Sequence, residues 1–220
     1  MRSLIPVILA LTMGSATAVL AAPAPAATAR PAASAIEDLG HYAEDAYDQA
    51  KIADWAKGRA SVEALKAAAR RLGPAERKDT ALTGQLDGAV SALDKAVYRR
   101  DKAVAMREAN LLTRLDAELS RPSRPAVPAD VTLLDYYGRE IEIWASARDE
   151  AKLRATVVGM GTTWRSLRPQ VVARGGRAVA SRFDVLVKQA ESAPRLDTLA
   201  HLATPILDEV DNLENAFTGK

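Results

Sequence analysis

The sequence predicts an all-α protein, an antiparallel up-down-up-down four-helix bundle built from a duplicated helical hairpin. Apolar residues recur at alternating three- and four-residue steps over long stretches, as they do in bundle helices. Proline and glycine clusters divide these stretches into four. Two segments also match at a constant offset of 89 residues, which is typical of an internal repeat. The matched pairs include Tyr47 with Tyr136, Ile52 with Ile141 and Trp55 with Trp144.

The first 21 residues have the pattern of a secretory signal peptide. Arg2 precedes an apolar run that ends near Ala16, and small residues follow it, so we expect cleavage between Ala21 and Ala26. The run is too short and too interrupted to span a bilayer. We therefore expect a periplasmic or secreted protein with no membrane span. Residues 22–35 are rich in Ala and Pro and predict a flexible spacer before a helical domain at 36–220.

The first hairpin repeat is predicted over residues 36–120. Its first helix should run over 36–72, because Gly73 and Pro74 supply a stop signal. Its second helix should begin at residue 75 or 81 and end near 119. Three prolines follow within residues 122–128, and they mark the boundary between the two hairpins.

The second hairpin repeat is predicted over residues 130–217. Asp130 is expected to cap the third helix, and Gly175-Gly176 should separate it from the fourth. Ser192-Ala193-Pro194 predicts a break in the fourth helix. Pro205 has two readings that the sequence leaves open: it kinks a continuous helix, or Thr204 caps a new helix that begins with proline.

The three tryptophans receive different expectations. Trp55 and Trp144 match in the repeat, so we expect both to anchor a core. Trp55 also begins a second apolar stripe, rotated from the first, which indicates a helix with two neighbours. Trp164 has no counterpart and lies in an Arg-rich segment, so it is the candidate for an exposed aromatic residue.

The composition excludes several function classes. The 30 Lys and Arg include Arg2 and Arg30, so the predicted domain carries 28 basic against 28 acidic residues. A nucleic-acid-binding protein needs a basic excess, and we expect no nucleic-acid partner. Cysteine is absent, which removes disulfides, thiolate ligands and thiol nucleophiles. Because no catalytic motif is present either, we expect no enzyme activity.

The charges are nevertheless unevenly placed along the four predicted helices. In an up-down-up-down bundle, the acids of the first turns of helix one would lie beside those of the last turns of helix four. Arg71 and Arg168 would lie at the opposite end. The sequence therefore predicts one acidic and one basic end.

A metal site is the most specific chemical hypothesis. Acids and a histidine recur along one ridge of the first helix, and an imidazole among carboxylates suits Zn, Cu, Mn or Fe, as a divalent or ferric ion. Acids of the fourth helix would complete the site. The candidate ligands are Glu37, His41, Glu44, Asp45, Asp208 and Asp211. The competing interpretation, a charged helix face exposed to solvent, is the commoner meaning of such a ridge.

The sequence thus predicts a non-enzymatic, exported helical-bundle protein that binds a protein partner or a small ligand. The charged ends are the expected contact surfaces. The alternative is a periplasmic metal-ion carrier or sensor that uses the acidic end. The small-residue seam of the first helix, Ala43 to Ala53, also allows a homodimer in which helices exchange between two chains.

Overall fold

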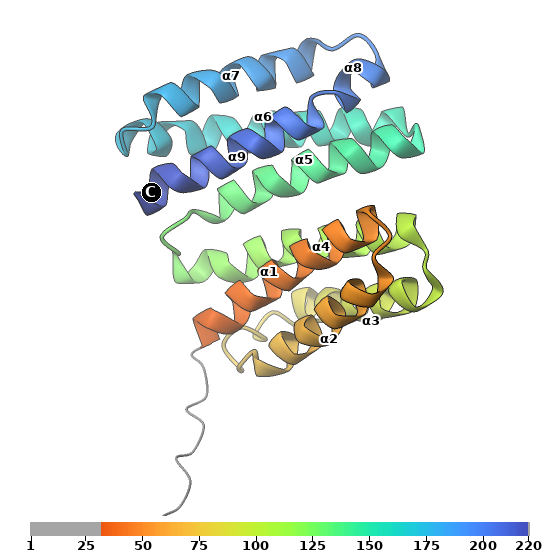
Figure 1. The fold of residues 1–220 in the computed structure, drawn as a ribbon. Helices are drawn as coiled ribbons and strands as arrows, with labels where there is room; N and C mark the ends of the chain where they lie inside the picture. The colour runs from red at the N-terminus through yellow and green to blue at the C-terminus, as the bar shows by residue number, and fades with distance from the viewer. Residues whose placement is uncertain (1–31, 220) are drawn as a thin grey trace, which may run out of the picture.

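The structure is a computed structural model that describes residues 32–219, with side chains from Ala35 onward (Figure 1). Every regular element in this part of the chain is helical, as predicted. The predicted signal peptide and most of the predicted spacer lie outside the described residues. The first helix begins at Ala32, four residues before the predicted start. None of the described helices is both long and apolar enough to cross a membrane.

The helices form two units that lie side by side (Figure 1). In each unit the chain runs from one helix to its neighbour, and the last helix packs back on the first. The first unit comprises α1 (Ala32–Lys51), α2 (Trp55–Arg71), α3 (Thr80–Arg99) and α4 (Lys102–Ser120). A short 3-10 helix, η1 (Arg121–Ser123), follows α4. The second unit comprises α5 (Ala129–Ala147), α6 (Glu150–Ala173), α7 (Arg177–Ser192), α8 (Leu196–Ala200) and α9 (Ala203–Thr218).

The prediction of four long helices in a single bundle is wrong for the described residues. The predicted helix ends are nearly right, but each long helix breaks near its middle and folds back on itself. Three of these breaks share one turn chemistry. Ala53, Arg100 and Arg148 adopt the left-handed conformation, which ends one helix. An aspartate follows each of them, and its carboxylate accepts a backbone N–H of the next helix.

These capping aspartates define the repeat that the structure shows. Asp54, Asp101 and Asp149 lie 47 and 48 residues apart, and each begins the second helix of a hairpin. The offset of 89 residues does not relate equivalent positions, because Trp55 opens α2 whereas Trp144 lies inside α5. The described chain is therefore a series of four helical hairpins.

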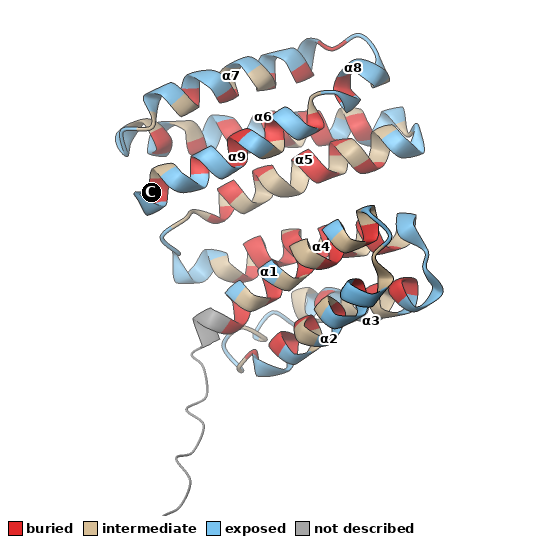
Figure 2. Cartoon of the chain, viewed as in Figure 1, coloured by how far each residue is buried: buried red, intermediate tan, exposed pale blue. Residues whose placement is uncertain are grey.

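Each unit has its own hydrophobic core (Figure 2). Leu39, Leu65 and Leu112 are fully buried in the first unit, and Phe183 and Leu213 in the second. The cores are not independent. Ile143 lies on α5 in the second unit but is buried in the core of the first, and Trp144 packs against both cores. The contact between α4 and α5 therefore joins the units.

The expectation that Trp164 is exposed is wrong, whereas Trp55 and Trp144 do pack against the cores. Trp164 is only 2% exposed, its ring centroid lies 4.6 Å from that of Phe183, and its indole N–H donates to Asp184 at 2.8 Å. Trp55 and Trp144 are only partly buried. Because the break at residues 52–54 makes Trp55 the first residue of α2, it lies at the edge of its unit.

The irregular segment in the last hairpin agrees with one of the two open readings. The predicted break at Ser192-Ala193-Pro194 is confirmed, because α7 ends at Ser192. Pro205 lies in the first turn of α9, which begins at Ala203, so it accompanies a helix start and does not kink a continuous helix. Thr204 is not the cap, since it lies within α9.

The predicted separation of charge between two ends is wrong for the first unit. The guanidinium of Arg71 lies 2.6 Å from the carboxylate of Asp38, although these residues were expected at opposite ends. The reason is the fold of the first hairpin: α2 returns antiparallel to α1, which brings the end of α2 beside the start of α1.

Candidate functional site

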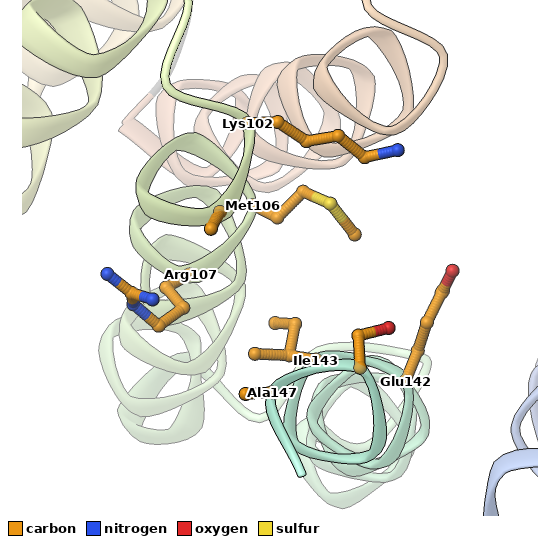
Figure 3. A pocket seen from close by; sticks show the side chains of 8 residues that line it. Lys102, Met106, Arg107, Glu142, Ile143 and Ala147 are labelled. Carbon is orange, nitrogen blue, oxygen red and sulfur yellow. The ribbon is translucent and has the colours of Figure 1, made fainter.

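A groove lies between α4 and α5, where the two units meet (Figure 3). Its volume is about 420 Å³, within the range of small-molecule sites, which often lie between domains. It is lined from α4 by Lys102, Ala103, Met106 and Arg107, and from α5 by Glu142, Ile143, Ser146 and Ala147.

The floor of this groove is apolar and its α4 rim is basic. Met106 and Ile143 face each other across it in Figure 3 and are 7% and 6% exposed. Lys102 and Arg107 supply two cations. The Lys102 ammonium donates to the carbonyl of Lys51 at 2.6 Å, and no carboxylate of the described residues pairs with it. Arg107 forms no ion pair within the described residues.

The one acid of the groove is already engaged. Glu142 accepts a hydrogen bond from the Tyr47 hydroxyl at 3.0 Å and pairs with the Lys51 ammonium at 2.9 Å. Its negative charge is therefore largely offset by Lys51. The groove presents an apolar surface beside a positive charge, which suits a ligand that combines an apolar body with an anionic group.

A polar seam continues from this groove between α1 and α5. Arg139 is 8% exposed, and its guanidinium carbon lies 5.0 Å from the ring centroid of the buried Tyr47. Its Nη2 atom lies 3.3 Å from Asp135 and 4.0 Å from Glu44. Burial and the Glu142 carboxylate raise the pKa of Tyr47, so its hydroxyl keeps its proton and donates.

The seam holds more acids than cations. Burial raises the pKa values of Glu44 and Asp135, while Arg139 opposes the effect at both residues. The Asp135 carboxylate also raises the pKa of Glu44, and Asp211 and Glu214 of α9 add further negative potential. Both carboxyls therefore hold protons at higher pH than isolated exposed acids do.

Asp116 of α4 lies at the far end of the seam, against α1. Burial, followed by the nearby charge of Glu37, raises its pKa to about 7. Asn110 and Thr113 of α4 are also fully buried. Five buried side-chain atoms along the seam have no hydrogen-bond partner among the described residues: Asn110 Oδ1, Thr113 Oγ1, Asp116 Oδ1, Asp135 Oδ2 and Arg139 Nη1.

The structure places the predicted metal ligands in several different surroundings. The nearest pair is His41 and Asp45, whose Nε2 and Oδ2 atoms are 3.6 Å apart on the exposed side of α1. Glu44 faces Arg139 instead, and Glu37 lies near Asp116. On α9, Asp208 is exposed and Asp211 lies near Asp135. Within the described residues, no three His, Asp or Glu side chains converge closely enough to hold a metal ion, and metal binding stays a prediction.

Sequence reasoning missed the groove and most of the seam. Glu44 and Asp211 are the candidate ligands that the seam does bring near other acids, which they meet on α5. Nothing in the sequence indicated that Asp135 and Arg139 are largely buried, because an acid and an arginine four residues apart usually form a pair on the surface. Their burial depends on the packing of α9 against α5 and on the α1 side chains Tyr47 and Glu44, which reach Arg139.

Comparison of the chain with protein-family models, with curated proteins and with solved structures found no match.

Proposed function

We propose that this chain is an exported, non-enzymatic binding protein that holds a small amphipathic anion in the groove between α4 and α5. The observation that carries the proposal is the pairing of an apolar floor, Met106 and Ile143, with two rim cations that form no ion pair within the described residues, Lys102 and Arg107. The two cations lie on opposite sides of Met106 in Figure 3, so a carboxylate or phosphate would bind at either of them, and an alkyl or aromatic body would cover the floor.

The groove favours an anion over a cation. Its only acid, Glu142, already pairs with Lys51 and accepts the Tyr47 hydroxyl, so a cationic ligand would have to displace Lys51. An anion needs no such exchange. The Lys102 ammonium has three donors and uses one on the Lys51 carbonyl, which leaves two for a ligand.

The test is titration calorimetry with decanoate below its micelle concentration, compared with the neutral decanol. We expect decanoate to bind with one-to-one stoichiometry and at least tenfold more tightly than decanol. The double variant Lys102→Gln/Arg107→Gln should weaken decanoate at least tenfold. Met106→Gln should weaken decanoate and decanol together, because it removes the apolar floor. Arg59→Gln, an exposed cation of α2, is the matched control and should change nothing.

Equal affinities for decanoate and decanol would show that the cations do not recognise the ligand. The proposal would be rejected if the folded protein did not bind decanoate. It would also be rejected if decanoate bound equally well after both rim cations were replaced.

A further inference from the structure

We propose that the end of the molecule formed by the turns after α1, α3 and α5 docks on an anionic lipid bilayer. The surface, called here the basic turn surface, is defined by Ile52, Lys95, Tyr98, Arg99, Arg100 and Arg148. It is separate from the groove residues and does not depend on the groove ligand.

The basic turn surface is formed by adjacent turns. The turns that follow α1, α3, α5 and α7 all lie at the same end of the molecule, on the right in Figure 1. Lys102, at the start of α4, bonds to the Lys51 carbonyl and also lines the groove with Ala147. Ile52, which follows Lys51, and Arg148, which follows Ala147, therefore lie near the first turn of α4. The turn that precedes α4 contains Arg100 and lies there too.

The cations of this surface are free and the acids beside them are not. Lys95, Arg99, Arg100 and Arg148 are exposed, and none forms an ion pair within the described part of the chain. The neighbouring acids Asp54, Asp101 and Asp149 each cap a helix by accepting a backbone N–H. Two of these caps also lie within 4 Å of a lysine. The four unpaired cations outnumber the remaining carboxylate, Asp101, which accepts only a backbone N–H among the described residues, so the net charge of this end is positive and complements an anionic surface.

Two large apolar side chains project from the same turns. Tyr98 is 81% exposed and Ile52 is 68% exposed, and they are two of the four exposed large hydrophobic residues in the described chain. Tyrosine is favoured at the membrane–water interface, where its ring lies among the headgroups. An aliphatic tip beside lysine and arginine is typical of surfaces that insert shallowly into a charged bilayer. An exposed isoleucine such as Ile52 has no group that bonds to a nucleic-acid phosphate, so the bilayer explains more of the surface.

The backbone at this surface is a second, independent feature. Arg100 and Arg148 have φ values of 59° and 54°, a conformation that glycine adopts without strain. Arginine at these positions strains the turn and adds an exposed positive charge. Strained residues tend to lie at functional positions. Glycine at either position should therefore weaken binding to the bilayer while raising the stability of the fold.

The test is co-sedimentation of the full chain with vesicles of phosphatidylglycerol and phosphatidylcholine in equal parts, with pure phosphatidylcholine as the neutral control. We expect binding to the anionic vesicles that falls as salt rises, and at least tenfold weaker binding to the neutral ones. Arg99→Gln/Arg100→Gln and Ile52→Ser/Tyr98→Ser should each weaken binding at least fivefold. Arg59→Gln/Val185→Ser, which removes an exposed cation and an exposed apolar residue elsewhere, should bind as the unaltered chain does.

Arg100→Gly keeps the test independent of folding, because it should weaken vesicle binding while raising the unfolding temperature. Arg107→Gln should weaken decanoate binding and leave vesicle binding unchanged, which distinguishes this proposal from the groove. Equal binding to neutral vesicles would overturn the proposal. The proposal would also be overturned if the Ile52→Ser/Tyr98→Ser variant still bound anionic vesicles and the chain bound a DNA duplex as tightly as it binds those vesicles. The surface would then recognise phosphate alone.

Discussion

The carboxyl group of Asp116 occupies the space that a side chain at Gly40 would need. A Cβ built on Gly40 would lie 2.9 Å from both Cγ and Oδ2 of Asp116, which is closer than such atoms approach in proteins. The two residues lie where α1 packs on α4 and closes the first unit. The absence of a side chain on α1 thus makes room for a buried acid on α4.

This contact predicts the effect of a methyl group. Gly40→Ala should lower the free energy of unfolding by about 1 to 3 kcal/mol, because the buried Asp116 side chain has little room to move. Urea denaturation measures it. Gly88→Ala is the matched control: it lies in α3 with no heavy atom within 4 Å of its added Cβ, and should raise stability by up to about 1 kcal/mol. If both variants gain stability, the close contact is absent in solution.

Asp116 also predicts an unusual dependence of stability on pH. Its pKa is about 7 in the folded protein against an ordinary 3.8, so between these values the folded state binds more protons than the unfolded state. Its contribution therefore favours folding below about pH 4 and is lost as the pH rises to 7. Asp116→Asn should raise the unfolding free energy at pH 8 by roughly 1 to 3 kcal/mol and change it little at pH 4. Asp208→Asn, at an exposed position, should have no such effect. Equal curves for Asp116→Asn and the unaltered chain would refute the shift.

The left-handed arginines predict two stabilising substitutions. Arg100→Gly and Arg148→Gly should each raise the free energy of unfolding by about 1 kcal/mol, because glycine adopts a positive φ without a steric cost. Arg99→Gly, in the last position of α3, should instead lower it by about 0.5 to 1 kcal/mol. Thermal unfolding followed by circular dichroism checks both signs. A loss at residue 100 as large as that at residue 99 would mean that the turn differs from the one described.

The tryptophans predict a clear order of core losses. Trp164→Ala should cost about 3 to 5 kcal/mol, as large truncations in a core do, and it also leaves Asp184 without the indole N–H. Trp55→Ala should cost under about 2 kcal/mol, because this side chain is only partly buried at the start of α2. Urea denaturation of the two variants tests the order. A larger loss at Trp55 than at Trp164 would restore the interpretation based on the sequence repeat.

The outer boundaries of the hairpins could be predicted from the sequence, because proline and glycine act locally. Gly73-Pro74, the prolines at 122–128 and Gly175-Gly176 all lie between helices, as predicted. The break at Ser192-Ala193-Pro194 was predicted, but the other three internal breaks were missed, because Ala53, Arg100 and Arg148 are not residues that usually end helices. Two signals were present: the rotated apolar stripe that begins at Trp55, and an aspartate at nearly constant spacing.

The candidate site was less accessible to sequence reasoning. The groove needs α4 beside α5, and a bundle of four unbroken helices has no such boundary between units. The ridge of acids on α1 was recognised, but its members face different neighbours, because adjacent residues such as Glu44 and Asp45 lie about 100° apart around a helix. Glu44 points to α5 while His41 and Asp45 remain on the exposed side. Which acids meet depends on tertiary packing.

The closure of α4 on α1 also sets the order in which the chain can fold. The contacts within each hairpin join residues close in sequence, so α1 with α2 and α3 with α4 can pair early. The first unit closes only when α4 packs on α1, and these two helices are separated in the sequence by the whole of α2 and α3. Its core also includes Ile143 of α5, so it is complete only when α5 has packed on α4. During synthesis, the α4 face of the first unit stays exposed until α5 has been made. A fragment that ends at Ser120 would therefore expose apolar surface to water.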